Sequence, residues 1–210
     1  MAKYDADFME SVGPPWDAIC GTAGMSTNLN AVVAAGHSSI VLAPGAILTA
    51  NLTLSGSDGA IWSFQHRGRI NLGAYYIWIS GSNWHLEGFE LNGSASTLLA
   101  FTGTSANCSV ERVLLQSGGS HGMYFTTSGG NHSVTDCAII GNTGDGVKIA
   151  SGSNGNRIVN NQIYGNTGYG VNDASSASIV GLNRIAANTA GNINGTPEVY
   201  LDDDVLNKLT

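Results

Sequence analysis

Apolar residues recur along the chain at intervals of about two dozen positions. One series has spacings of 24, 24, 24 and 22 positions and contains Leu86, Val110, Val134, Ile158 and Val180. A second series follows each of these residues by five positions and contains Leu91, Leu115, Ile139, Ile163 and Ile185. Around both series apolar and polar residues alternate, and Gly-rich segments bound each alternating stretch. Period-two alternation is typical of half-buried strands, and a fixed longer period is typical of repeat architectures.

A sequence motif repeats at the same interval. GNTGDGV at 141–147 recurs as GNTGYGV at 165–171, and more weakly as ANTAGNI at 187–193. A repeat of this length holds three short strands and three turns. Stacked repeats let each strand pair in parallel with its copy about 4.8 Å away. The sequence therefore predicts an all-β solenoid, a parallel β-helix of about six coils with 22–24 residues each.

The position three residues after each member of the first series is polar in the later repeats. This series contains Phe89, Val113, Cys137, Asn161 and Asn183. If the position points inward, Asn161 and Asn183 form a short ladder whose amides pair with backbone groups at a bend. Cys137 is then a small buried apolar residue rather than a nucleophile.

The two ends of the chain depart from the repeat. Apolar residues in 27–36 predict a short amphipathic helix that ends at Gly36 and caps the stack. We therefore divide the chain into an N-terminal arm (1–26), a parallel β-helix (27–197) and a C-terminal cap or contact tail (198–210). The Asp202–Asp204 run favours a helix start over a calcium loop, because consecutive carboxylates do not match the alternating ligands of such a loop.

Composition narrows the classes of partner. The net charge is -7, only 11% of residues are charged, and no Lys/Arg cluster occurs, which argues against nucleic acid and anionic membranes. The chain has no apolar stretch typical of a signal peptide or a membrane span. Its three cysteines lack the spacing of a zinc site and do not suggest a disulfide framework. We expect no metal and no cofactor.

Two segments resemble a known group of proteins. NLNAVVAAGHSSIVLAPGAI at 28–47 is similar to the entry segment of the pectate-lyase-like β-helix superfamily, where a capping helix precedes a strand that ends in a Pro-Gly turn. LEGFELNG at 86–93 resembles the coil pattern of the same superfamily. The resemblance covers roughly residues 27–195 and implies a right-handed, single-stranded parallel β-helix. It says little about activity, because the superfamily includes lyases, hydrolases, epimerases, phage tailspikes and inert virion proteins.

Residues one repeat apart should lie on adjacent coils, and this predicts two polar groupings. Arg112 and Asp136 share a register and should form a surface ion pair worth under about 1 kcal/mol. His121, Asp145 and Tyr169 share another register, with Tyr124 and Lys148 in a third close by. If the chain is an enzyme, His121, Asp145 and Lys148 are the candidate catalytic residues.

The sequence also leaves open other functional roles for residues on these coils. Tyr124, Tyr169 and Trp84 are the candidate substrate-binding residues, because aromatic rings stack on sugar faces. Glu87 and Glu111 share a register and could serve glycoside hydrolysis, although no long loop is available to build a cleft. For the His121 group and for the two glutamates, the sequence favours ordinary solvent-facing side chains over catalytic ones.

The leading functional hypothesis is a non-enzymatic structural or adhesion protein of a virion, such as a phage capsid-decorating or tailspike-like subunit. Phage β-helices commonly form trimers, so the resemblance implies a homotrimer, with the N-terminal arm contacting other virion proteins and a host surface polysaccharide as a further partner. Virion location is expected; the alternatives are the cytoplasm or release without a signal peptide. The competing functions are a polysaccharide lyase or glycoside hydrolase, and a carbohydrate-binding module.

Overall fold

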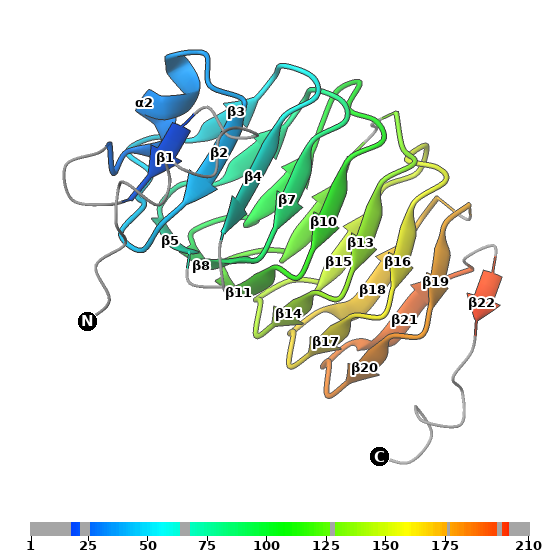
Figure 1. The fold of residues 1–210 in the computed structure, drawn as a ribbon. Coiled ribbons are helices and arrows are strands. Elements are labelled where there is room, and N and C mark those ends of the chain that lie inside the picture. Colours follow the sequence, from blue (N-terminus) through cyan, green and yellow to red (C-terminus); the bar gives the residue numbers. More distant parts are fainter. Residues whose placement is uncertain are drawn as a thin grey trace.

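The chain folds into a right-handed parallel β-solenoid of about seven turns, one more than the six expected (Figure 1). The computed structural model describes residues 18–21, 26–63, 68–126, 129–175, 177–196 and 199–201. Among these residues the only helix is α2 (Leu29–Ala34), which begins at the N-cap residue Asn28 and lies near the position predicted for a capping helix.

The strands form three parallel sheets, A, B and C. In spatial order, sheet A contains β1 (Ala18–Cys20), β2 (Ser39–Leu42), β4 (Ala60–Ser63), β7 (His85–Glu87), β10 (Ser109–Glu111), β13 (Ser133–Thr135), β16 (Arg157–Val159), β19 (Ile179–Gly181) and β22 (Val199–Leu201). Sheet B contains β5 (Gly68–Gly73), β8 (Phe89–Ser94), β11 (Leu114–Gly118), β14 (Ala138–Ile140), β17 (Gln162–Tyr164) and β20 (Arg184–Ala186). Sheet C contains β3 (Leu52–Leu54), β6 (Ile77–Ile79), β9 (Leu99–Phe101), β12 (Met123–Phe125), β15 (Val147–Ile149), β18 (Tyr169–Asp173) and β21 (Gly191–Gly195).

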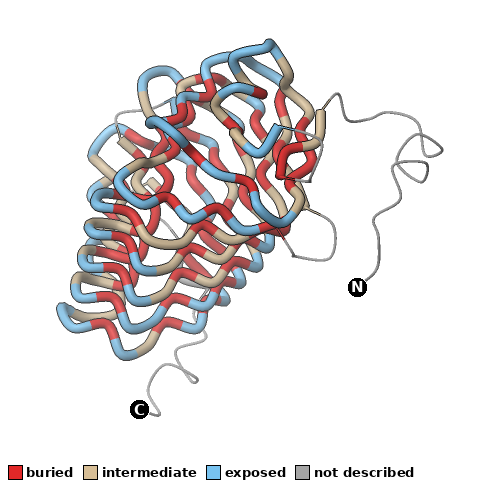
Figure 2. The backbone as a smooth tube through the Cα atoms, turned by 90° about the vertical axis from the view of Figure 1, so that its left-hand side faces the viewer, coloured by how far each residue is buried: buried red, intermediate tan, exposed pale blue. Residues whose placement is uncertain are grey.

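The strand register confirms both predicted apolar series as interior columns. Val110 pairs with Leu86 on one side and Val134 on the other, and Leu115 pairs with Leu91 and Ile139 in the same way. Buried and exposed positions alternate along each coil (Figure 2). Because each coil buries its apolar side chains only against the coils above and below, the stack is the unit of stability.

The solenoid extends into both segments that the sequence assigned to an arm and a tail. Strand β1 pairs with β2 through Ala18 and Ile40, and β22 pairs with β19 through Ile179 and Val199. The boundaries predicted at residues 26 and 198 therefore differ from those of the strands. The rest of both segments, including the Asp202–Asp204 run, lies outside the described residues.

The repeated GNTG-x-G motif is explained by the corner between sheets B and C. Gly141 has a φ of +63°, a left-handed conformation that glycine adopts without strain. Asn142 turns inward and is 1% exposed. At Gly146 a Cβ atom would lie 2.6 Å from the Ile163 Cγ2 atom and 2.7 Å from the Gly170 carbonyl oxygen, so only glycine fits between adjacent coils.

Inward-facing amides form two ladders at the corners. The predicted one is confirmed: the Asn183 Oδ1 atom accepts the backbone N–H of Asn161 at 2.8 Å and its side-chain amide at 3.0 Å. The second ladder, Asn142–Asn166–Asn188, was not predicted, although the repeated GNTG motif contains it. Both ladders satisfy buried backbone groups that the turns leave unpaired.

Cys137, Cys108 and Cys20 are buried free cysteines. Cys137 is 2% exposed, as predicted, and burial raises the pKa of its thiol to about 12. Cys108, which the repeat left unassigned, lies in an inward register one rung from His132, whose Nδ1 atom accepts the Cys108 backbone N–H at 3.2 Å. Both thiols pack as small core side chains.

Candidate functional site

The structure brings the predicted His121 grouping together at the corner between sheets B and C. The His121 Nδ1 atom lies 3.5 Å from the Asp145 Oδ2 atom, and the His121 and Tyr124 ring centroids are 5.6 Å apart. The Lys148 Nζ atom lies 5.5 Å from the Tyr124 ring centroid. The neighbour relations deduced from the repeat therefore hold for His121, Tyr124, Asp145 and Lys148.

The hydrogen bonds at this corner do not form an acid–base dyad. The His121 Nδ1 atom accepts the backbone N–H of Asp145 at 2.9 Å, so this nitrogen carries no proton to share with the carboxylate. Asp145 is 6% exposed, and its oxygens accept the Tyr169 backbone N–H at 2.8 Å and the Asn172 amide at 3.0 Å. Burial is the main cause that lowers the pKa of His121. Both side chains thus hold adjacent coils in register.

The outward-facing positions of sheet C form a continuous row beside this corner. One residue from each strand contributes to it, and adjacent members are register partners: Thr53, Trp78, Ala100, Tyr124, Lys148, Asn172 and Asn194. We call this row the outer column of sheet C. From β3 to β21 it presents a hydroxyl group, two aromatic rings separated by an alanine, a cation and two amides.

Trp78 is the residue that sequence reasoning missed in this column. Its side chain is 39% exposed, and its ring stacks on that of Tyr76 with centroids 4.5 Å apart. Ala100, which is 3% exposed, separates Trp78 from Tyr124 in the column. The alternation IWI at 77–79, with two buried isoleucines around the tryptophan, was the signal for an outward ring.

Two of the predicted aromatic residues take other positions. Trp84 is only 3% exposed, and its Nε1 atom donates to the Gly56 carbonyl oxygen at 2.7 Å. Its ring belongs to the core and offers no face for stacking on a sugar, contrary to the expected substrate-binding role. Tyr169 is half-buried at the corner, where its ring lies against Gly191 of the next coil.

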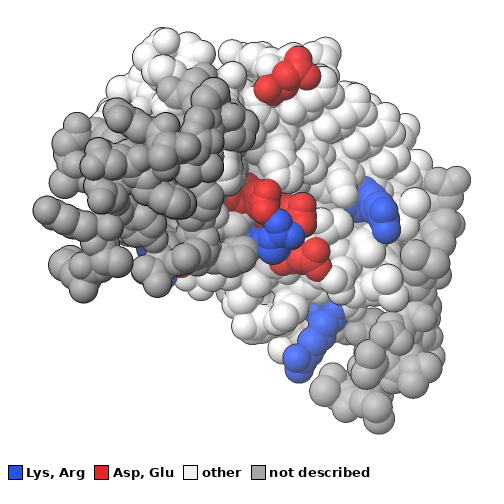
Figure 3. Space-filling model, in the orientation of Figure 1, with Lys and Arg blue, Asp and Glu red and all other residues white. Residues whose placement is uncertain are grey.

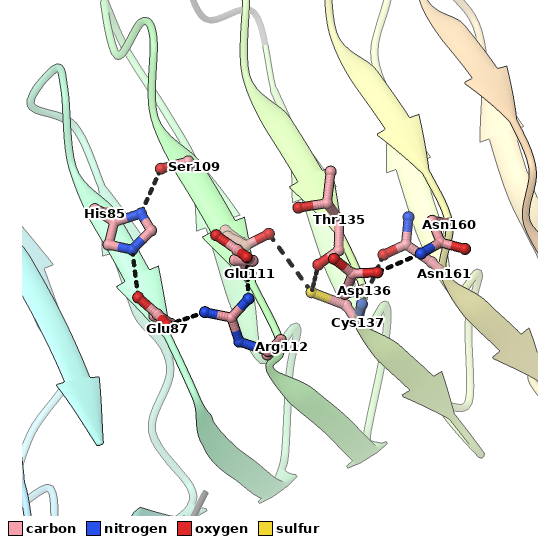
Figure 4. A network of polar contacts seen from close by, with 11 residues as sticks. His85, Glu87, Ser109, Glu111, Arg112, Thr135, Asp136, Cys137, Asn160 and Asn161 are labelled. Atoms are coloured by element: carbon pink, nitrogen blue, oxygen red, sulfur yellow. Dashed lines mark hydrogen bonds and ion pairs between the residues drawn. The ribbon is translucent and has the colours of Figure 1, made fainter. Parts of the chain in front are cut away.

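A second polar group lies on the outer face of sheet A (Figures 3 and 4). The His85 Nε2 atom lies 2.8 Å from the Glu87 Oε2 atom, and Arg112 forms ion pairs with both Glu87 and Glu111. The predicted Arg112–Asp136 ion pair is therefore wrong. The long Arg112 side chain reaches back over sheet A to two carboxylates, and Asp136 instead accepts a hydrogen bond from Asn160.

This group has the ligand types of a metal site but already holds a cation. Ligand atoms of His85, Glu87 and Glu111 lie within 4.8 Å of one another. The guanidinium of Arg112 already pairs with the carboxylates of Glu87 and Glu111. The pKa of Glu87 is lowered, first by its hydrogen bond with His85 and then by Arg112. The arrangement fits a surface ion-pair network better than a divalent-cation site.

Parallel strands in three sheets, interior apolar columns and inward amide ladders define a right-handed parallel β-solenoid. The chain belongs to the right-handed beta helix family, whose model matches residues 26–196. No curated protein and no solved structure gives a significant match to the chain. Within the described part of the chain, no helix has the length and apolar character needed to cross a membrane.

Proposed function

We propose that this protein binds a polysaccharide along the outer column of sheet C and does not cleave it. A β-helix domain fits a protein that binds or acts on polysaccharide. The column runs along the solenoid axis, so an extended polymer can contact several coils at once. Each coil then contributes one side chain to a linear site.

The observation that carries the proposal is the pair of outward aromatic rings, Trp78 and Tyr124, with Ala100 between them. The negative face of an aromatic ring attracts the weakly positive C–H groups of a pyranose face. Lys148 and Asn172 continue the column and supply donors for sugar hydroxyl or carboxylate oxygens. Stacking supplies contact area, and the polar residues supply orientation.

The absence of cleavage is proposed from the state of the candidate catalytic groups. The His121 Nδ1 atom and both Asp145 oxygens already accept hydrogen bonds from the protein. Lys148 lies over the Tyr124 ring, where cation–π attraction holds its ammonium group. Proton transfer needs a group within reach of the substrate in the right protonation state. Here His121 and Asp145 serve structure instead, and Lys148 serves binding.

Affinity electrophoresis against a panel of neutral and acidic polysaccharides tests the proposal. Trp78→Ala and Tyr124→Ala should each weaken binding by about tenfold, because each removes a stacking surface. Ile47→Ala, which changes a 44% exposed apolar side chain elsewhere, is the matched control. New reducing ends or unsaturated products would contradict the non-catalytic role, and unchanged binding by Trp78→Ala would contradict the site.

The finer proposal is that this binding serves a virion adhesion protein. It is supported by the resemblance to virion β-helices and by the lack of a free acid–base pair among the candidate residues. Mass spectrometry of purified phage particles whose genome encodes the chain tests it. Detection at a fixed copy number would support a virion role, and absence from the particles would contradict it. The contact with other virion proteins stays a prediction. The homotrimer that the resemblance implies also stays a prediction, and it is an alternative to association of two copies through sheet B.

A further inference from the structure

The outer face of sheet B carries an unusual distribution of side chains. Its first column, from β5 to β20, contains Arg69, Glu90, Leu114, Ala138, Gln162 and Arg184. Its second column contains Asn71, Asn92, Gln116, Ile140, Tyr164 and Ala186. The charged residues of this face thus lie in the first column on β5, β8 and β20, and the rung at β14 carries only the apolar residues Ala138 and Ile140.

Two large apolar side chains are well exposed on or beside this face. Tyr164 is 40% exposed, and Leu182, on the turn that precedes β20, is 53% exposed. Leu182 also has a φ of +54°, a conformation that costs a branched residue about 1 kcal/mol or more. Exposed apolar side chains gathered on one face are the kind of surface that other proteins cover.

We infer that sheet B mediates self-association, with a second copy docked face to face and its solenoid axis reversed. The twofold axis passes through strand β14, so Ile140 meets Ile140 of the other copy and Ala138 meets Ala138. Strands two rungs on either side of β14 then face each other across the interface. Such a contact is isologous, with the same patch used by both copies.

Charge selects this arrangement. In the reversed dimer Arg184 on β20 faces Glu90 on β8 of the other copy, and two opposite-charge contacts form. The Oε1 atom of Glu90 already accepts from Arg69 at 2.6 Å and from Gln116, but the Oε2 atom has no donor among the described residues. Arg184 is exposed and has no ion pair in the described part of the chain. Complementary charges of this kind fix the register of an interface.

The alternative arrangements lose this complementarity. A dimer or a trimer with parallel axes places the same strand of each copy side by side. Arg184 of one copy then lies near Arg184 of the next, and the two positive charges repel. Moving the twofold axis to a point midway between β14 and β11 would bring β5 opposite β20, and Arg69 would then face Arg184. In the reversed dimer the exposed Leu182 instead meets the turn at Gly88. Asp136 meets its own copy at the adjoining corner, outside the strands, where it accepts a hydrogen bond from Asn160. This like-charge contact is unfavourable, and the two Arg184–Glu90 contacts must outweigh it.

The interface is small. The five rungs from β8 to β20 span about 20 Å along the axis at the usual strand spacing, and each strand is only three to six residues long. Interfaces below the standard size give weak, reversible complexes. We therefore expect a dimer that dissociates at low micromolar concentration and assembles at high micromolar concentration.

Sedimentation velocity of the full chain across that concentration range tests the inference. Arg184→Glu and Glu90→Arg should each raise the dimer dissociation constant by about tenfold. The double variant should restore most of the affinity, because the opposite charges then meet again. Arg157→Glu, which makes the same charge change on an exposed residue of sheet A, is the control and should leave dimerisation unchanged.

Circular dichroism of each variant separates loss of association from loss of fold, which concerns Glu90→Arg in particular because Glu90 also pairs with Arg69. A reversible dimer with rescue by the double variant supports the inference. A protein that stays monomeric at high concentration, a stable trimer, an Arg184→Glu variant that behaves like Arg157→Glu, or a well-folded double variant without rescue would each overturn it.

Discussion

Asn166 lies directly above Asn142, and its Oδ1 atom accepts both the Asn142 backbone N–H at 3.0 Å and the Asn142 side-chain amide at 2.9 Å. The Asn166 side-chain amide donates in turn to the Ile139 carbonyl oxygen at 3.2 Å. One buried side chain therefore satisfies several polar groups at a corner that water does not reach. Without it these groups would be buried and unpaired.

Replacing Asn166 by alanine should destabilise the fold by about 2–4 kcal/mol, since at least two buried backbone groups lose their partners. Asn92→Ala is the matched control, because the Asn92 amide donates to Asn71 on the outer face of sheet B. The control should cost less than about 0.5 kcal/mol. Urea unfolding of the three proteins measures the difference. Equal losses of unfolding free energy in both variants would show that the inward ladder stabilises the fold no more than a surface hydrogen bond does.

The same corner offers a reciprocal test of backbone strain. Gly165 and Ala187 occupy equivalent positions with φ values of +67° and +54°. A Cβ atom at Gly165 would meet only the Gly141 backbone nitrogen, at 3.9 Å, so the change to alanine adds strain without a clash. Gly165→Ala should therefore lower stability, and Ala187→Gly should raise it, each by about 1 kcal/mol. Changes of the same sign in thermal or urea unfolding would contradict this account.

His132 should make the fold sensitive to acid. Its ring is 1% exposed and packs at a tilt of 34° against Phe101, with centroids 4.4 Å apart, and burial lowers its pKa from 6.5 to about 4. Between about pH 4 and 6.5, His132 is therefore protonated in the unfolded chain and neutral in the folded chain. Stability is full above about pH 6.5, falls as the pH drops towards 4, and is lower by about 3 kcal/mol below that.

Unfolding at neutral and acidic pH measures this loss, and His132→Asn should reduce it. An asparagine keeps an acceptor for the Cys108 backbone N–H and has no proton to gain. His121→Asn is the comparison. Burial also lowers the pKa of His121, so replacing this residue should also reduce the loss of stability at acidic pH. If wild type and His132→Asn show the same pH dependence, His132 does not control acid stability.

The ion-pair network on sheet A should matter little for stability. The Arg112 side chain is 42% exposed, and its carboxylate partners Glu87 and Glu111 are 30% and 32% exposed. Arg112→Ala should change the free energy of unfolding very little, and the difference from wild type should shrink at high salt. The same variant should raise the pKa of Glu87, which NMR titration can follow. A salt-independent loss of several kcal/mol would mean that the network is more than a surface feature.

Much of the candidate site follows from the repeat. Because parallel strands pair in register with their copies, residues one repeat apart become neighbours. The repeat alone therefore places Tyr124 beside Lys148 and Asp145 beside Tyr169. The repeat is less regular in the first coils, where Ile40 pairs with Ile61 and Ile61 with Leu86. For this reason the column that includes Trp78 was harder to extend from the sequence.

The sequence by itself determined the solenoid, its interior columns and the Asn161–Asn183 ladder, because a constant period in a stack of parallel strands converts directly into adjacency. Only the tertiary structure decided which way individual side chains point and how far they reach. Each turn can reset the alternation of inward and outward positions, which buried Trp84 and exposed Trp78. A long side chain can also choose among partners on several coils, which directed Arg112 to Glu87 and Glu111 rather than to Asp136.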